Sequence, residues 1–217
     1  MRSWVISGAL LIGLTMPAAA RDLDAKFLIE RKGEVIGYHA VDVTPTDAGA
    51  RVDTLIEMKV GIGPITLFKY EHDATEIWNG EQLVSLVSKT NNNGENEFVD
   101  AKRYGKQLVI DASGYQGPAP AGAMPSSYWD KDLVSANAMI NTQTGEIMEV
   151  TTSRVGETLA PHDRPAEQFQ LIGTVALNLW YDGERWVGSN FTIDGEELTY
   201  VLVDEPQEIA LLENMAP

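Results

Sequence analysis

Short β-type runs separated by glycine turns constrain this chain more than any other feature of its sequence. The runs are rich in Val, Ile, Thr and Tyr and alternate with a period of two, as half-buried strands do. We therefore expect an all-β protein, an antiparallel meander of about ten or eleven strands curled into an open or half barrel. The predicted turns are Lys32-Gly33, Ala48-Gly49, Asn79-Gly80, Asn93-Gly94, Tyr104-Gly105, Thr144-Gly145, Asp182-Gly183 and Asp194-Gly195.

Helical patterns are scarce in this sequence. One short helix is predicted over Asp132 to Ile140, with Asp130 or Asp132 as its N-cap, and a weaker pattern covers Gln207 to Asn214. The stretch Gly114 to Ser127 holds three of the ten prolines and three glycines. We interpret that stretch as a long loop that crosses between two groups of strands, with an active-site lid as the alternative.

The last two hairpins can be placed in register from their turns. If the first turn spans residues 182–184, Leu179 lies opposite Val187. A two-residue turn at 194–195 places Phe191 opposite Leu198. Side chains of these pairs then share one face, as a packed core requires.

The same register predicts that Trp180 lies beside Trp186 on the other face, with Val201 and Val203 nearby. Both faces of this part of the sheet are therefore partly apolar. Such a sheet must bend round a helix, close on itself or cover a ligand, because otherwise one apolar face stays in water.

The N-terminus has the three regions of a secretory signal. Arg2 precedes an apolar run from Trp4 to Met16, and Ala18-Ala19-Ala20 fits a small-residue cleavage site. The run is shorter than the roughly 20 residues that a bilayer needs. We expect residues 1–20 to be a cleaved signal peptide, 21–205 a single β-rich domain and 206–217 an acidic C-terminal tail. The expected location is the periplasm, with full secretion as the alternative.

The charge balance excludes several partners. Sixteen Lys and Arg against 32 Asp and Glu give a formal net charge of −16, which becomes −17 without the signal because that segment holds one Arg and no acid. Nucleic acid and anionic membrane surfaces require clustered cations, and the sequence shows none. The absence of cysteine excludes disulfides, a thiol nucleophile and thiolate-bound metals.

Two segments carry a resemblance to a known family. PSSYWDKDLV (Pro125 to Val134) and the hairpin pair from Leu171 to Leu202, with its LWYD, WVG and YVL motifs, resemble an uncharacterised bacterial family of exported proteins of about this length. The resemblance implies an exported β-protein of unknown function and assigns no catalytic residue. More distantly, the layout is similar to the curved half-barrels of lipoprotein carriers, in which a sheet surrounds a short helix over an apolar cavity.

Catalytic motifs are missing. The sequence has no Gly-x-Ser-x-Gly elbow and no Ser-x-x-Lys. His39, His72 and His162 are far apart; the last two each precede an aspartate and are candidate corners of a metal site, although ordinary polar positions are the favoured interpretation. A further acidic cluster suggests paired glycosidase carboxylates, but 32 acids make such neighbours common and a solvated strand is favoured: Glu71, Asp73 and Glu76. We predict no catalytic residue, metal or cofactor.

Aromatic residues give a stronger indication of function than the catalytic and metal motifs do. Tyr128, Trp129, Trp180 and Trp186 are predicted to line a ligand groove, with core packing as the alternative for each. The sequence thus favours a non-enzymatic periplasmic binding or carrier protein for a lipid, another hydrophobic ligand or an envelope component. It is not expected to be an integral membrane protein. The alternative is a hydrolase-like periplasmic enzyme that uses histidine and carboxylates in a cleft of the sheet.

Overall fold

A computed structural model describes residues 23–62, 65–173, 176–193 and 195–204. The predicted signal peptide at 1–20 and the tail at 206–217, with its weak helical pattern, lie outside these ranges. Among the described residues, no helix has the length and apolar character needed to cross a membrane.

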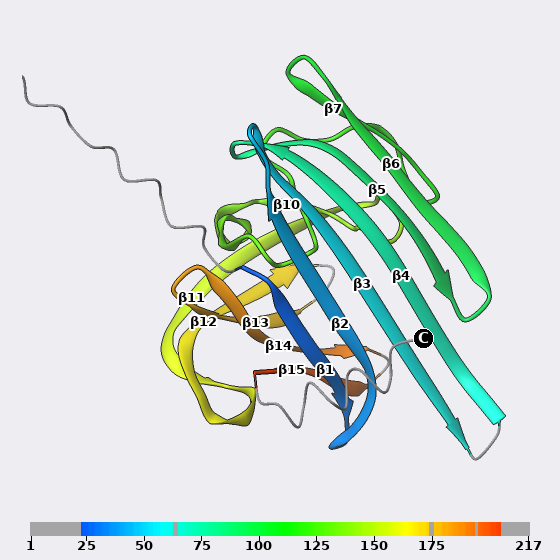
Figure 1. The fold of residues 1–217 in the computed structure, drawn as a ribbon, viewed down its shortest axis with the longest axis vertical. Coiled ribbons are helices and arrows are strands. Elements are labelled where there is room, and N and C mark those ends of the chain that lie inside the picture. The colour runs from blue at the N-terminus through cyan, green and yellow to red at the C-terminus, as the bar shows by residue number, and fades with distance from the viewer. Residues whose placement is uncertain (1–22, 63–64, 174–175, 194, 205–217) are drawn as a thin grey trace, which may run out of the picture.

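Fifteen strands form one mixed sheet, which confirms the all-β class (Figure 1). The order is β8-β7-β6-β5-β4-β3-β2-β1-β15-β14-β13-β12-β11-β10-β9, and every pair is antiparallel except β9 with β10. The strands are β1 Ala25–Arg31, β2 Glu34–Pro45, β3 Gly49–Ile62, β4 Ile65–Asn79, β5 Gln82–Asn92, β6 Glu95–Tyr104, β7 Gln107–Ala112, β8 Gln116–Pro118, β9 Met124–Pro125, β10 Ala138–Ile140, β11 Ile147–Ala160, β12 Arg164–Gly173, β13 Leu177–Asp182, β14 Arg185–Ile193 and β15 Glu196–Leu202.

Glycine turns delimit the long strands as predicted. In the turn between β5 and β6, Asn93 and Gly94 both adopt positive φ, at 52° and 97°, which is the left-handed pair that a tight hairpin requires. The strand number exceeds the expected ten or eleven in part because the 114–127 stretch and its continuation contain β8, β9 and β10. These strands have two or three residues each, too few to show a period of two.

The helix predicted over Asp132 to Ile140 is wrong beyond its first turn. A 3-10 helix, η1, covers Lys131–Ser135, and Asp130 caps it by accepting a hydrogen bond from the Asp132 backbone N–H at 2.9 Å. The buried residues Ala138–Ile140 form β10 instead, paired with β9 and β11. Pairing with two neighbours therefore overrides the local helical pattern.

The register of the last hairpins is partly as predicted. Phe191 lies opposite Leu198, which is confirmed, but Leu179 lies opposite Ser189 and not Val187. The turn between β13 and β14 is one residue shorter than expected, and a bulge follows it between Trp180 and Tyr181. A bulge reverses which residues share a face.

As a result, Trp186 pairs with Tyr181, whereas Trp180 pairs with Gly188. The expected side-by-side arrangement of Trp180 and Trp186 is therefore wrong. Trp180 instead donates a hydrogen bond from Nε1 to Thr158 Oγ1 on β11, at 2.9 Å.

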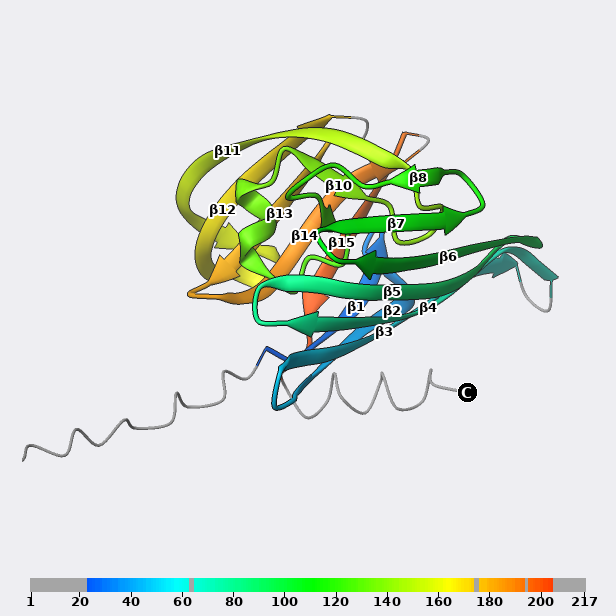
Figure 2. The same ribbon diagram turned by 90° about the horizontal axis from the view of Figure 1, so that it is seen from above.

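The sheet stays open, and its two halves lie on opposite sides of residues 119–146, here called the inner segment (Figure 2). On one side the Trp129 indole of this segment donates to Glu76 of β4. On the other side Lys131 donates to Glu167 of β12, at 2.8 Å. The sheet face that touches the inner segment is called the inner face below, and the opposite one the outer face. The main core lies along the inner face.

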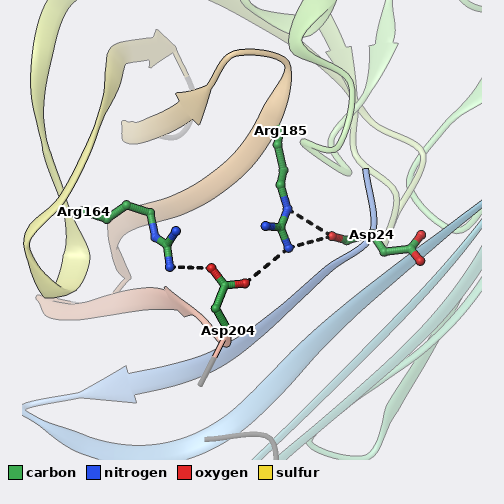
Figure 3. Close-up of polar contacts among 4 residues, drawn as sticks. All are labelled: Asp24, Arg164, Arg185 and Asp204. Carbon is green, nitrogen blue, oxygen red and sulfur yellow. Dashed lines mark hydrogen bonds and ion pairs between the residues drawn. The ribbon is translucent and has the colours of Figure 1, made fainter. Parts of the chain in front are cut away.

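Charged contacts join the two ends of the described domain (Figure 3). Asp204, just after β15, accepts from Arg164 at 2.6 Å and lies 3.4 Å from Arg185. Arg185 also donates to the backbone carbonyl of Asp24, just before β1. The Asp204 carboxylate therefore ties the starts of β12 and β14 to the end of β15, and Arg185 extends the link to the start of β1.

Candidate ligand-binding site

The inner segment is held on β4, β5 and β6 by polar contacts. Ser88 Oγ donates to the Thr142 carbonyl at 2.6 Å. Gln143 accepts from the Tyr70 hydroxyl at 3.2 Å and donates to the Glu97 carboxylate. These groups sit between sheet and segment, where polar atoms need partners because water is excluded.

Glycine lets the inner segment approach the sheet closely. Gly145 has φ +78°, and a Cβ placed there would lie 2.3 Å from the Cβ of Ala112 on β7. Gly122, in the same segment, has φ +75° and open space around its Cα. Contact with the sheet therefore limits the residue type at position 145, whereas only the positive φ limits it at position 122.

Glu76 forms a buried anchor between β4 and the inner segment. Its Oε2 accepts from Trp78 Nε1 at 2.8 Å and from Trp129 Nε1 at 3.1 Å, and the two indoles meet edge to face. Burial raises the pKa of the Glu76 carboxyl, which hydrogen bonds from Ser127 and the two indoles partly offset. The sequence pattern favoured a solvated strand for Glu71, Asp73 and Glu76. That interpretation is wrong for Glu76, because only Glu71 and Asp73 lie on the other face of β4.

A cluster of rings around Trp186 occupies the middle of the inner face. Trp186 is 1% exposed, and its ring centroid lies 4.1 Å from Phe27, 5.2 Å from His39 and 6.0 Å from Tyr200. Tyr128 of the inner segment stacks edge-on against it at 5.5 Å. Four strands and the inner segment therefore converge here, through what we call the ring cluster.

His39 is the exceptional member of the ring cluster. It is 2% exposed, and neither ring nitrogen has a hydrogen-bond partner. Ser189, on β14 and paired with Tyr200, is 1% exposed and its hydroxyl is likewise unpartnered. Burial lowers the pKa of His39 to about 3, with a smaller effect from nearby His72, so the imidazole is neutral at pH 7.

The other histidines have ordinary surroundings. His72 is bonded through Nδ1 to Thr90 Oγ1 at 2.8 Å, and burial lowers its pKa to about 4. His162, in the 3-10 helix η2 (Pro161–Asp163), is exposed and lies 3.5 Å from Glu30. Within the described ranges, no group of three or more His, Asp or Glu side chains is placed to hold a metal ion.

A surface pocket of about 310 Å³ opens beside the inner segment. Its apolar wall includes Trp78 and Leu83, and residues 119–124 of the inner segment line it as well. Its charged lining residues are Arg103, Lys106 and Glu81, and the Arg103 guanidinium donates to the Leu83 carbonyl at 2.6 Å. Trp78 joins this pocket to the Glu76 anchor, so the pocket lies next to the buried interior.

Of the four aromatic residues predicted to line a groove, three meet the inner segment or its surroundings. Trp129 and Tyr128 belong to the segment, and Trp186 packs beneath it. Trp180 points to the outer face and is 6% exposed. The sequence patterns did not predict a role in the site for Glu76 or Ser189, and they indicated His39 only as one of three scattered histidines. The alternation His72, Ala74, Glu76, Trp78 was a signal that could have placed Glu76 inside.

Comparisons with known proteins give a fold and a family. A crystal structure of a β-barrel-like protein of the domain of unknown function DUF1849 from Brucella abortus is similar, with a TM-score of 0.61 and 10% identity over 83% of this chain and 95% of that one. At that identity the likeness concerns the fold alone. No curated protein matches the sequence. A family model described as a domain of unknown function, DUF6134, matches residues 27–203, and the chain therefore belongs to that family.

Proposed function

We propose that this chain is an exported, periplasmic binding protein for a hydrophobic ligand that carries one polar or anionic end. The site is the inner face around the ring cluster, and the ligand takes the place of part of the inner segment. The observation that carries the proposal is the pair of buried, unpartnered polar groups, His39 among the rings of the cluster and Ser189 on β14 opposite Tyr200.

Buried polar groups without partners are costly. Each one destabilises the folded state by about 1–3 kcal/mol relative to a satisfied group. Leu or Phe would fill the His39 position without that cost, and the ring cluster already supplies apolar surroundings. A ligand hydroxyl or carbonyl that reached these groups would recover the missing hydrogen bonds, which supports a binding role for the position.

The surface pocket supports a route of entry. Trp78, Leu83 and the 119–124 stretch give the pocket an apolar wall, and Arg103 and Lys106 outnumber Glu81 among its charged lining residues, in a chain whose net charge is −16. A net positive charge beside an apolar wall favours a ligand with an anionic end. A long-chain carboxylate has this combination.

The histidine contacts do not favour the enzymatic alternative. His39 faces rings, His72 bonds a threonine and His162 contacts one carboxylate at the surface. A hydrolytic centre would need a histidine in reach of a nucleophile or of two carboxylates. Export is supported by the N-terminal sequence, and N-terminal sequencing of the periplasmic protein is expected to begin at Arg21.

Native mass spectrometry of protein isolated from the periplasm without detergent tests the proposal. The expected result is a bound species that adds the mass of a lipid or fatty acid. Titration with dodecanoate should change tryptophan fluorescence because Trp186 and Trp129 lie in the site. A protein that carries no added mass and shows no fluorescence change with dodecanoate would contradict the proposal.

The charged mouth can be tested with a matched ligand pair. Dodecanoate and dodecanol share a chain and differ in charge, so removal of the Lys106 ammonium in Lys106→Ala should weaken binding of the acid several-fold and leave the alcohol unaffected. Equal loss for both ligands would argue against charge recognition at the pocket. Lys102→Ala, which removes a surface lysine paired with Asp100, is the control.

A further inference from the structure

The hairpin of β3 and β4 extends beyond its neighbours in the sheet. The last pair between β2 and β3 joins Gly37 with Met58, and β5 begins to pair with β4 at Tyr70. Past these limits, over residues 59–62 and 65–69, the two strands pair only with each other within the described part of the chain. Figure 1 shows these paired ends apart from the turns between β1 and β2 and between β5 and β6. We call the two ranges the hairpin tip.

The hairpin tip is apolar beyond its base. The sequence from Val60 to Phe68, VGIGPITLF, has no charged residue, although charged residues make up 22% of the chain. Leu67 is 55% exposed, and Val60 and Phe68, which lie opposite each other, are half-buried. Gly61 then pairs with Thr66, so a bulge leaves Leu67 without a residue opposite it. The tip therefore presents a large apolar side chain to its surroundings.

Other hairpins of the same sheet end in charged or polar residues. Their turns are RKGE at 31–34, NNGE at 92–95 and DGER at 182–185. Such residues keep the end of a strand pair in water and hinder its association with other molecules. The apolar tip departs from this pattern, and a projecting apolar surface of this kind marks an interaction site.

Two lysines face each other at the base of the tip. Lys59 on β3 lies directly opposite Lys69 on β4, and both are exposed. Like charges in that position destabilise a strand pair, so the two lysines do not serve the stability of the hairpin. Lys69 lies 2.6 Å from Glu71, whereas Lys59 has no ion-pair partner within the described residues. Glu57 opposite Glu71 is the next outward pair. From its end inward the hairpin is thus apolar, then positive, then negative.

This order follows the polarity of a phospholipid surface. Apolar side chains enter the boundary of the acyl chains, lysine ammonium groups meet the lipid phosphates, and carboxylates stay in water. The net charge of −16 opposes approach to an anionic surface. We propose that the hairpin tip docks on a zwitterionic phospholipid surface. Leu67 reaches the acyl boundary with Val60 and Phe68 beside it, and the two lysines lie at the phosphates.

Docking at the tip is independent of ligand binding at the ring cluster. Ile56 of β3 lies opposite His39, and the tip begins further along the same strand, at Lys59. The contact would therefore hold the open sheet beside a source of hydrophobic ligands. It rests on the geometry and sequence of the hairpin alone, so a failure to bind dodecanoate would leave it unchanged.

Sedimentation with phosphatidylcholine vesicles tests the docking, with protein purified from the periplasm. The unmodified protein should sediment with the vesicles. Leu67→Asp should lower the bound fraction about tenfold, because it places a charge at the acyl boundary. Leu159→Asp is the matched control, since Leu159 on β11 is 56% exposed, and this variant should bind as the unmodified protein does.

The lysine pair is tested in the same assay. Lys59→Gln should weaken vesicle binding several-fold, because it removes one ammonium group from the phosphates. Lys102→Gln, on β6, should leave binding unchanged. Equal binding of the two variants would overturn the role given to the lysines.

An environment-sensitive thiol dye reports the contact directly, because the chain has no cysteine. On Leu67→Cys the emission should shift to the blue when vesicles are added, and on Leu159→Cys it should not. An unshifted dye at position 67 would overturn the proposal, as would absent sedimentation or equal loss from the two aspartate variants. A blue shift that needs no vesicles and grows with protein concentration would also overturn it, by assigning the tip to contact between copies.

Discussion

Glu76 and His39 are both polar side chains buried on the inner face, but Glu76 lacks a partner only at Oε1, whereas His39 lacks one at both ring nitrogens. Glu76 accepts from two indoles, one from the sheet and one from the inner segment, so it holds the two layers together. His39 has rings on its sides and no partner for either nitrogen. The first arrangement is a structural anchor; the second is a site that stays unsatisfied in the absence of a ligand.

This difference separates the contacts that stabilise the fold from those at the proposed ligand site. The polar contacts that fix the inner segment include Trp129 on β4, Lys131 on β12 and residues 142–145, which face β4 to β7. Tyr128, next to Trp129, packs instead on the ring cluster. A ligand could therefore replace contacts at the cluster while the anchors keep the segment attached.

Removing the anchor should have the largest effect. Trp129→Ala is expected to lower the free energy of unfolding by about 3–5 kcal/mol, because it leaves a large cavity and takes one donor from Glu76. Chemical denaturation measures the change. Trp129→Phe keeps most of the ring volume and should cost much less. If both substitutions cost under 1 kcal/mol, the anchor role assigned to Glu76 and Trp129 is wrong.

Lowering the pH should reduce the free energy of unfolding, because two histidines are buried in their neutral form. The folded pKa of His39 is about 3, below the ordinary 6.5, so below pH 6.5 the unfolded chain binds a proton that the folded chain does not. Stability is therefore lost as pH falls, by about 1.4 kcal/mol per pH unit for this group. His72 adds a similar loss down to its pKa of about 4.

The His39→Leu variant isolates the contribution of His39 to the loss of stability at low pH. Between pH 8 and pH 4.5 it should lose about 3 kcal/mol less stability than the unmodified protein, since the other titrating groups are shared. Denaturation curves at the two pH values provide the comparison. Identical losses in both proteins would mean that His39 is solvated or protonated in the folded state.

Crowding the contact at residue 145 should have an intermediate effect. Gly145→Ala forces its new methyl group against Ala112 and is expected to cost about 1–3 kcal/mol more than Gly122→Ala, which shares the positive φ but meets open space. Thermal unfolding of the two variants gives the difference. Equal melting temperatures would show that the inner segment does not press on β7.

Replacing the unpartnered polar side chains at the ring cluster with apolar ones should have the smallest effect on stability. At pH 8, His39→Leu is expected to stabilise the ligand-free protein by about 1 kcal/mol, because it removes an unpartnered polar group. Ser189→Ala should act in the same direction, and the equivalent change at the bonded Thr90, Thr90→Val, should destabilise. Destabilisation by His39→Leu would indicate that the imidazole has a partner in solution.

The turn chemistry made the strands predictable, whereas the site depends on features that leave weak local signals. Asn93-Gly94 and its equivalents define hairpins on their own, and the Phe191–Leu198 register follows from turn length. The bulge at Trp180 and Tyr181 does not, since nothing in the local sequence marks it. It moved Trp186 to the inner face and separated it from Trp180.

Contacts between distant segments were likewise beyond a sequence pattern. The pairing of Trp129 with Glu76 joins residues 53 positions apart. The three-residue strand β10 depends on pairing with β11, and the two-residue strand β9 depends on pairing with β10. The polar interior was partly readable, because His72, Glu76 and Trp78 alternate along β4. The missing partners of His39 depend on packing from β1, β14 and β15.

Isothermal titration of dodecanoate into the unmodified protein and into His39→Leu tests the central claim most directly. Trp180→Phe, altered on the outer face, is the control. We expect His39→Leu to bind at least tenfold more weakly, which equals about 1.4 kcal/mol, while folding normally, and Trp180→Phe to bind as the unmodified protein does. Equal affinity of the unmodified protein and His39→Leu, or no binding by either, would contradict the assignment of the ring cluster as the ligand site.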